Sequence, residues 1–402
     1  MKKLLAALIC ISMFMGLLAG CSKSSDEKSN ETVTAAPTSA AEVTKAVSDL
    51  VTQFDFSSVE KQTNDPSFPG GAYFFQEIKD IIGPCPIPDK EVKVGFIMKS
   101  LENEYWVSMY NGINEEVDRL KSEGYKITVD IRAGQTETDQ EGQLAIMNDM
   151  VNKKYDVIVC GPISDSNLVP GIEAAQDAGI PVVTLSVAYD SNPYVPNFVG
   201  LSSYASGKAV AQYFDEKISD EGGEVAIIMG IANNPSARDR TAGFKAYIEE
   251  NPQSNMKLVD IQNADWDRAK AKDVTDTLLK AHPDLKAIFC NNDTMALGSI
   301  ESIKAADKVG QILVGGVDGT KEAIESIKKG EISCTCNQYS YYLGKVALNV
   351  AFRAMAGQEV PNRIWGPFGI IDTANADAEA ADIINWTDLE YTLVNNHYGC
   401  MR

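Results

Sequence analysis

Short apolar runs alternate with helical patterns from residue 92 to residue 338, and this alternation constrains the fold of the chain most strongly. In the clearest unit, residues 265–298, Asp267 can cap a helix that His282-Pro283 ends, and the apolar run LKAIFC follows. Such runs are typical of parallel strands buried on both faces. Repeated strand–helix units with right-handed crossovers predict an α/β fold with two doubly wound, Rossmann-like parallel sheets.

The N-terminus has the composition of an export signal. Lysines 2 and 3 precede an apolar run that is too short to span a membrane, so we expect residues 1–20 to be a signal peptide. Leu18-Ala19-Gly20-Cys21 resembles a bacterial lipobox, which predicts lipidation of Cys21 and anchoring to the extracytoplasmic face of a membrane. An ordinary signal peptide with an incidental cysteine is the alternative. Residues 21–46 contain almost no large apolar residue, and we expect a flexible linker there.

The remaining residues divide into an extension and two lobes. Residues 47–90 show weak periodicity and are expected to form an irregular extension. A proline-rich stretch near residue 200 interrupts the alternation, so a second sheet should begin after it. The late helix and strand should return to the first sheet, which makes three crossings between the lobes. The predicted lobes are residues 91–201 with 339–366, and residues 202–338 with 367–402, including an acidic C-terminal tail.

Charge and residue usage exclude several functions. The formal net charge is −20 with no compensating basic stretch, which argues against a nucleic-acid partner. His282 and His397 are the only histidines, and no Ser or Cys stands in a nucleophile-elbow pattern, so we predict no catalytic residue and no enzyme. The sequence contains neither a ligand spacing typical of a metal site nor a glycine-rich phosphate loop, and we predict no metal and no cofactor.

Cysteine pairing is left open by the sequence. Besides Cys21, six cysteines follow the signal peptide, and in an oxidising compartment six cysteines allow fifteen pairings. Cys160 and Cys290 lie in apolar runs and are expected to be buried thiols. Cys85 and Cys400 lie in polar segments outside the repeated units, so a disulfide between them is one option.

Polar and aromatic side chains follow the predicted strands, at the edge where open α/β proteins bind ligands. In chain order they are Asn103, Tyr105, Trp106, Asp165, Arg238, Trp266, Arg268, Asn292, Asp293, Asp318 and Gln338. Aromatic faces can cover the C–H surface of a polyhydroxy ligand, while carboxylates accept from its hydroxyl groups and Arg or amide groups donate to its oxygens. Taken singly, some of these residues have another explanation. Asn292 could be only a helix cap, and residues 238–240 could form surface ion pairs. Together these residues predict a cleft for a sugar-like ligand.

Similarity to a known family lies in four stretches: SARDRTAGF, DWDR, TLLKAHPDLKAIFCNNDTMALG and VDGT. They resemble the corresponding motifs of ribose-type periplasmic sugar-binding proteins, the substrate-binding components of ABC transporters, and the resemblance spans about residues 91–372. It implies a two-domain clamshell that closes on a sugar, polyol or cyclitol and delivers it to an ABC permease. It also implies ligand contacts at Asn103, Tyr105, Trp106, Arg238, Trp266, Arg268, Asn292, Asp318 and Gln338, with Tyr105 and Trp266 on opposite faces of the ligand.

Some positions depart from the ribose-binding pattern. Ribose binders carry an Asp-Arg pair where this chain has Ser186-Val187, an Asn where it has Gly161, and a Phe where it has Val317. The first lobe has therefore lost a carboxylate and a guanidinium, and ribose is not the expected ligand. A ligand-sensing receptor that docks on a sensor kinase or chemoreceptor is the alternative function, because the lobes that deliver a ligand would also form the docking surface.

Overall fold

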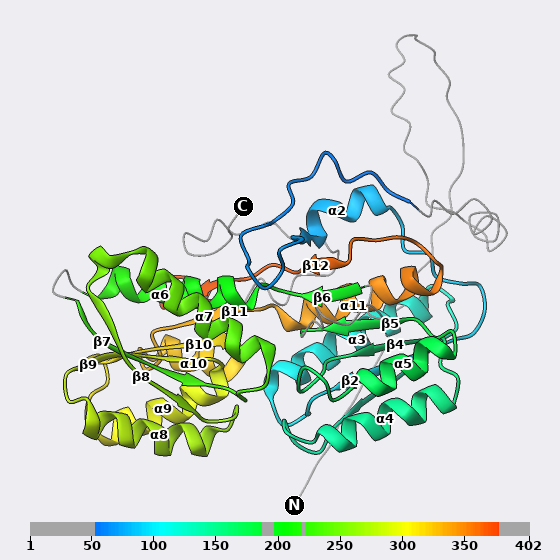
Figure 1. Ribbon diagram of the computed structural model, residues 1–402. Helices are drawn as coiled ribbons and strands as arrows, with labels where there is room; N and C mark the ends of the chain where they lie inside the picture. Colours follow the sequence, from blue (N-terminus) through cyan, green and yellow to red (C-terminus); the bar gives the residue numbers. More distant parts are fainter. Residues whose placement is uncertain (1–52, 187–196, 219–221, 378–402) are drawn as a thin grey trace, which may run out of the picture.

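The computed structural model describes residues 53–186, 197–218 and 222–377, which form two α/β lobes lying side by side (Figure 1). In this part of the chain the first lobe contains the strands β1 (Tyr73–Phe74), β2 (Val92–Met98), β3 (Ile127–Ala133), β4 (Val157–Cys160), β5 (Val182–Leu185), β6 (Asn197–Gly200) and β12 (Arg363–Trp365). Its helices are α2 (Phe75–Ile82), α3 (Glu104–Ser122), α4 (Gln140–Asn152), α5 (Val169–Asp177) and α11 (Ser340–Met355). The strands lie in the order β1-β12-β6-β5-β4-β2-β3 and pair in parallel.

The second lobe repeats the same architecture. Its strands are β7 (Gly223–Met229), β8 (Met256–Asn263), β9 (Leu285–Cys290), β10 (Leu313–Asp318), β11 (Cys334–Asn337) and β13 (Gly369–Ile371). Its helices are α6 (Ser203–Lys217), α7 (Pro235–Glu250), α8 (Arg268–Ala281), α9 (Asp293–Ala305) and α10 (Lys321–Lys328), with a 3₁₀ turn η1 (Pro252–Ser254). The strand order is β13-β11-β10-β9-β7-β8, parallel except for the antiparallel pair of β11 and β13.

The predicted fold class, two parallel sheets joined by three crossings, is confirmed. The chain passes between the lobes after β6, between β11 and α11, and between β12 and β13. The late strand β12 pairs with β6 in the first sheet, and β13 pairs with β11 in the second. Because only these segments join the lobes covalently, they are the places where a hinge can bend.

The unit that is clearest in the sequence folds as its local chemistry dictates. Asp267 accepts a hydrogen bond from the Lys270 amide at 2.8 Å and caps α8, which ends at His282 as predicted. Strand β9 follows, with residues 287–290 fully buried. Helix α9 begins at Asp293, directly after Asn292, which caps it by accepting a hydrogen bond from the backbone amide of Met295.

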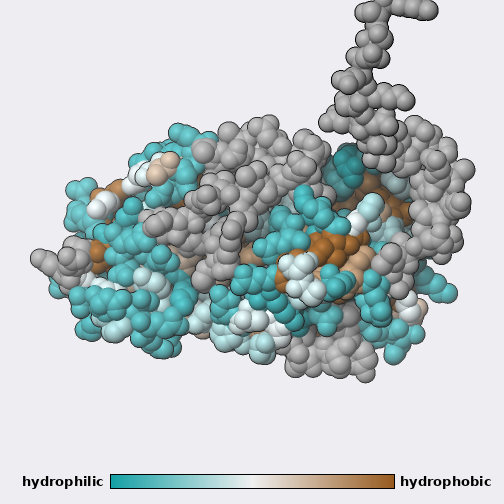
Figure 2. All heavy atoms as spheres, turned by 90° about the horizontal axis from the view of Figure 1, so that it is seen from above, coloured by the Kyte–Doolittle hydropathy of each residue, from teal (hydrophilic) through white to brown (hydrophobic). Residues whose placement is uncertain are grey.

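The prediction of an irregular extension is wrong for residues 73–82. Strand β1 lengthens the first sheet by pairing with β12, and α2 buries Phe75 and Ile78 against the core. A strand of two residues is too short to show a periodic pattern, so the sequence did not reveal it. Seen from the side of the extension, most of the coloured surface is hydrophilic, and hydrophobic atoms gather in an area over the first lobe (Figure 2).

Strand β6 was not expected either, since the prolines before it indicated a loop. The predicted burial of Cys160 and Cys290 is confirmed. Cys85 is a free thiol 3.8 Å from the carbonyl oxygen of Asn349, and Cys400, its suggested partner, lies outside the described residues, as does Cys21. No helix in the described part of the chain has the length and apolar character needed to cross a membrane.

Candidate functional site

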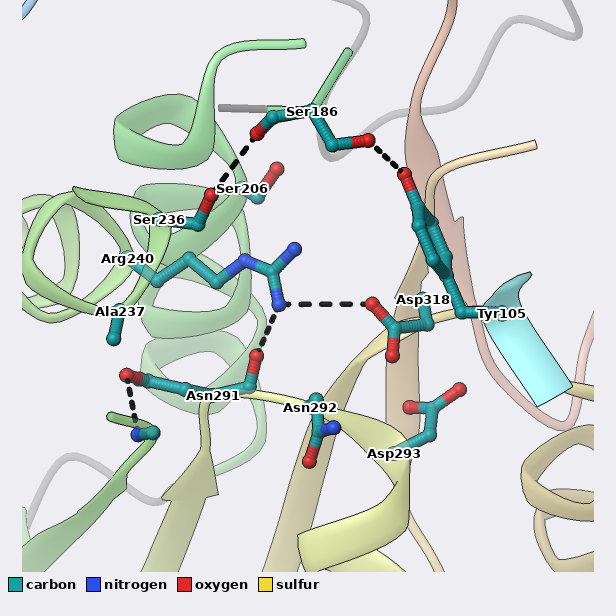
Figure 3. A network of polar contacts seen from close by, with 12 residues as sticks. Tyr105, Ser186, Ser206, Ser236, Ala237, Arg240, Asn291, Asn292, Asp293 and Asp318 are labelled. Carbon is teal, nitrogen blue, oxygen red and sulfur yellow. Dashed lines mark hydrogen bonds and ion pairs between the residues drawn. The ribbon is translucent and has the colours of Figure 1, made fainter. Parts of the chain in front are cut away.

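A cavity lies between the two lobes, at the carboxyl ends of their strands. The first lobe contributes Lys99, Asn103, Tyr105, Trp106, Glu137 and Ser186, and the second contributes Ser236, Arg240, Trp266, Asn292 and Asp318. The structure thus brings together six of the nine predicted contact residues: Asn103, Tyr105, Trp106, Trp266, Asn292 and Asp318. Figure 3 shows Arg240 and Asp318 facing each other across this space, with Tyr105 and Ser186 on its first-lobe side.

Two asparagines of the cavity are fixed in place by helix capping. Asn103 accepts a hydrogen bond from the Tyr105 amide at 2.9 Å, and Asn292 accepts one from the Met295 amide at the same distance. In both cases the side-chain oxygen makes the cap, so the amide nitrogen can still donate elsewhere. The structural reading of Asn292 as a cap and the functional reading are therefore compatible.

The two tryptophans need glycines behind them. A Cβ atom at Gly161, directly after β4, would lie 2.8 Å from Cη2 of Trp106. A Cβ at Gly230, directly after β7, would lie 2.3 Å from Cζ2 of Trp266. Gly161 therefore replaces the asparagine of ribose binders for a steric reason, because the larger aromatic ring of Trp106 occupies that space.

Arg240 and Asp318 form the central charged pair of the cavity. Nη1 of Arg240 lies 3.6 Å from Oδ1 of Asp318 and donates a hydrogen bond to the carbonyl oxygen of Asn291 (Figure 3). Burial raises the pKa of Asp318 well above its usual value, and the facing guanidinium partly opposes this shift. The guanidinium carbon of Arg240 also lies 5.7 Å from the centre of the Trp266 ring, within cation–π range.

The first lobe supplies a second pair of charges that the sequence reading missed. Lys99 directly follows β2, and its Nζ lies 5.7 Å and 5.8 Å from the ring centres of Trp106 and Trp266. Burial lowers the pKa of Lys99 to about 8, while the neighbouring Glu137 opposes that shift. Burial also raises the pKa of Glu137. The first lobe was expected to lack a carboxylate and a cation at the cavity, and this expectation is wrong. Glu137 and Lys99 supply the two charges, although they follow other strands than the Asp-Arg pair of ribose binders does.

Three residues of the cavity have unusual backbone conformations. Ser186, Trp266 and Asp318 have φ angles of 62°, 67° and 133°, which non-glycine residues rarely adopt. Such conformations persist where the surrounding structure imposes them, and they are common at ligand sites. The Ser186 hydroxyl is held 2.7 Å from the Tyr105 hydroxyl, so this residue orients an aromatic ring of the cavity.

Arg238 does not line the cavity, contrary to the prediction. Its guanidinium donates to both carboxylate oxygens of Asp165 at the surface. Two residues along an α-helix correspond to about 200° of rotation, so Arg240 points inward while Arg238 points outward. The position after β7 therefore predicts the correct segment of α7, but it does not predict which of the two arginines faces the cavity.

Arg268 and Gln338 also lie outside the cavity lining. Arg268 pairs with Glu301 and Glu322 within the second lobe. Gln338 is buried beside Asp318, whose carbonyl oxygen accepts from the Gln338 amide at 3.1 Å. The neighbouring Asp293 is structural, because its buried carboxylate accepts from the amide and hydroxyl of Thr320 and from the hydroxyl of Thr335.

Buried polar atoms of the cavity remain without partners. Across the described residues, the buried side-chain atoms lacking a hydrogen-bond partner include Nε of Arg240, Nε1 of Trp266 and Oε1 of Glu137. Unpaired buried donors and acceptors are costly, so their concentration here favours a ligand that completes them. Among the described residues, no three His, Cys, Asp or Glu side chains are arranged to hold a metal ion.

Two parallel-sheet lobes, three crossings and an interlobe cavity of aromatic and charged side chains define a two-lobed solute-binding protein. Residues 94–359 match the family model of the periplasmic binding protein domain. The chain belongs to the periplasmic binding protein family.

Several relatives have known ligands. The chain is 36% identical over 284 residues to the D-allose-binding periplasmic protein of Escherichia coli K12. The matched region covers 69% of this chain and 89% of that protein. It is 32% identical over 283 residues to the D-ribose/D-allose-binding protein of Pseudomonas aeruginosa, and the matched region covers 67% of this chain and 84% of that protein. The crystal structure of an ABC transporter periplasmic solute binding protein from Actinobacillus succinogenes 130z with bound D-allose matches with a TM-score of 0.65 and 28% identity, over 72% of this chain and 100% of that one. The predicted family resemblance is confirmed.

Proposed function

We propose that this protein captures a sugar or a closely related polyol in the interlobe cavity and delivers it to an ABC permease. The observation that carries the proposal is the cavity itself, in which two tryptophans lie beside buried charges with unused hydrogen-bonding atoms. Rings can cover the apolar faces of a sugar while the charged groups bind its hydroxyls. The comparisons with known proteins give no support to the sensing alternative.

The charge balance of the cavity favours a neutral ligand. Two cationic side chains, Lys99 and Arg240, lie with two carboxylates, Glu137 and Asp318. A neutral polyhydroxy compound can accept from the cations and donate to the carboxylates without adding a net charge to a buried site. D-Allose is the first candidate because two of the relatives described above are named as D-allose-binding proteins. D-Ribose is the second, since the Asp-Arg pair of ribose binders is absent.

The proposed ligand contacts follow from the cavity lining. They are Asn103, Tyr105, Trp106, Trp266, Asn292 and Asp318, together with Arg240, Lys99 and Glu137. We also retain Gln338, because within the described residues its buried Nε2 atom has no hydrogen-bond partner and its backbone touches Asp318. In the proposed arrangement Tyr105 and Trp266 cover opposite faces of the ligand.

The proposal includes a membrane anchor. The lipobox-like segment before Cys21 supports export, removal of residues 1–20 and lipidation of Cys21, with residues 21–46 as a flexible connection to the lobes. These residues lie outside the described part of the chain. Metabolic labelling with a fatty acid, compared between the wild type and Cys21→Ser, tests this part of the proposal.

A thermal-shift and calorimetric screen with D-allose, D-ribose and myo-inositol tests the binding function. A ligand at 100 times its Kd that binds only the folded state stabilises it by about 2.7 kcal/mol, which raises the melting temperature measurably. We expect Arg240→Ala to abolish the shift and Arg268→Ala to retain it, because only Arg240 lines the cavity. Absence of binding by the wild type, or equal loss in both variants, would contradict the proposal.

A further inference from the structure

Two charged contacts join the lobes outside the cavity. Arg238 of the second lobe donates from its two terminal nitrogens to the carboxylate of Asp165 in the first lobe, at 2.9 and 3.2 Å. Glu104, the first residue of α3 in the first lobe, accepts from the amides of Lys321 and Glu322 at the N-terminus of α10, at 3.1 and 3.2 Å. We refer to these two interactions as the rim contacts.

The rim contacts are built on the same segments as the cavity. Glu104 stands between Asn103 and Tyr105, and Arg238 stands between Ser236 and Arg240, and these four neighbours line the cavity. The side chains of Arg238 and Asp165 are 46% and 51% exposed, so this pair faces solvent and not the cavity. The rim contacts therefore lie next to the ligand space without reaching into it.

Two other hydrogen bonds between described residues join the lobes. The Ser236 hydroxyl donates to the carbonyl oxygen of Ser186 at 3.1 Å, and both residues line the cavity. The side-chain amide of Asn234 donates to the carbonyl oxygen of Ile163 at 2.7 Å. Asn234 also caps α7 through its side-chain oxygen, so replacing it would disturb the start of that helix. The rim contacts are the ones that can be removed without such damage.

Ligand access requires the rim contacts to break. Trp106, Trp266 and Asp318 are at most 6% exposed, so a sugar can reach the cavity only when the lobes separate. Opening by the several ångströms that a sugar needs would separate atoms that now lie at hydrogen-bond distance. The rim contacts thus belong to the closed state alone, and they favour that state whichever ligand is enclosed.

We propose that Arg238, Asp165 and Glu104 are positioning residues that set the affinity by holding the lobes closed, without touching the ligand. This inference rests on the proposed function. The Arg–carboxylate pair is bidentate, and a carboxylate at a helix N-terminus is favoured by the helix dipole. Because both contacts are exposed, dissolved salt screens them. Loss of either should weaken binding about two- to five-fold.

The test compares Asp165→Asn and Glu104→Gln with the matched control Glu301→Gln. Glu301 pairs with Arg268 inside the second lobe, and the two side chains are 42% and 41% exposed, close to the values of the Arg238–Asp165 pair. Kd is measured by calorimetry for D-allose and D-ribose at low and high ionic strength. We expect each rim variant to raise Kd by the same factor for both sugars at low salt, with the difference reduced at high salt and Glu301→Gln unchanged. Arg238→Gln combined with Asp165→Asn should be no weaker than either single variant.

The inference would be overturned by an unchanged Kd in both rim variants, by an equal change in Glu301→Gln, or by factors that differ between the two sugars. A lower melting temperature without a salt-dependent change in Kd would assign the contacts a structural role only, and would also overturn it. Failure of the wild type to bind any of the sugars is a different outcome, because it would overturn the proposed function and this inference with it.

Discussion

The cavity between the lobes and the junction between the extension and the first lobe each bury an arginine. Arg240 in the cavity is 7% exposed and Arg353 at the junction is 1% exposed. Every guanidinium nitrogen of Arg353 donates to a protein acceptor: Asn349 Oδ1, the carbonyl oxygens of Ile82 and Gly83, and Gln358 Oε1. Arg240 faces Asp318 and donates to Asn291, while its buried Nε has no partner among the described residues.

Hydrogen-bond satisfaction, more than burial, separates a binding arginine from a structural one. Arg353 donates hydrogen bonds to the last residue of α2 and to the following glycine, and so attaches the extension to α11. Arg240, whose guanidinium lies over the ring of Trp266, has a buried Nε donor that no described residue accepts from. Since an unpaired buried donor lowers stability, a protein retains one where a ligand supplies the missing acceptor.

Arg240→Met has the largest expected effect. It should weaken sugar binding about 100-fold or more, because charge-assisted hydrogen bonds to the ligand are lost. It should also lower the free energy of unfolding by about 3 kcal/mol, because the buried Asp318 loses its compensating charge. Calorimetry and denaturant titration measure the two effects.

The double variant Arg240→Met with Asp318→Asn separates binding from stability. It removes the uncompensated carboxylate, so much of the stability should return while binding stays lost. Recovery of sugar binding in this double variant would show that Arg240 serves only to neutralise Asp318.

Arg353→Met should reduce stability alone. Its loss leaves the buried carbonyl oxygens of Ile82 and Gly83 without donors, which should cost about 2 to 3 kcal/mol of unfolding free energy. The Kd for the sugar should not change, because the cavity is not touched. Arg353→Lys keeps the positive charge but loses the several donors of the planar guanidinium. Its stability should therefore lie between those of the wild type and Arg353→Met. A weakened Kd in Arg353→Met would remove the contrast between the two arginines.

Lys99 should give the smallest effect, a pH dependence of a few-fold. Its pKa is about 8 in the folded protein, below the ordinary lysine value, so between that pKa and the unfolded one the unfolded chain holds more protons. Stability should therefore rise as pH increases through this window, as the cost of burying the ammonium disappears. Affinity should fall over the same window as the charged donor is lost. Lys99→Met should flatten both profiles, and an unchanged pH profile in this variant would assign the dependence to Glu137 or Asp318.

Much of the site could be predicted from strand ends, and the failures have local physical causes. Trp266 and Asn292 closely follow β8 and β9, and Asp318 is the last residue of β10, so a correct prediction of these strands also locates the three residues. The sequence does not distinguish Arg238 from Arg240, because the rotation of α7 relative to the cavity depends on how that helix packs on the sheet. Lys99 and Glu137 follow β2 and β3, so their position in the sequence carries the same strand-end signal.

The alternation of apolar runs and helical patterns by itself determined the two sheets, and the cap residues determined where helices such as α8 begin. These features depend on interactions between residues close in the chain, which a sequence displays directly. Only the tertiary structure decided that Arg238 joins the lobes at the rim, that Arg353 binds the extension, and that β1 belongs to the first sheet. These contacts join residues far apart in the chain, and their energy depends on distances and burial that arise only when the two lobes and the extension have packed.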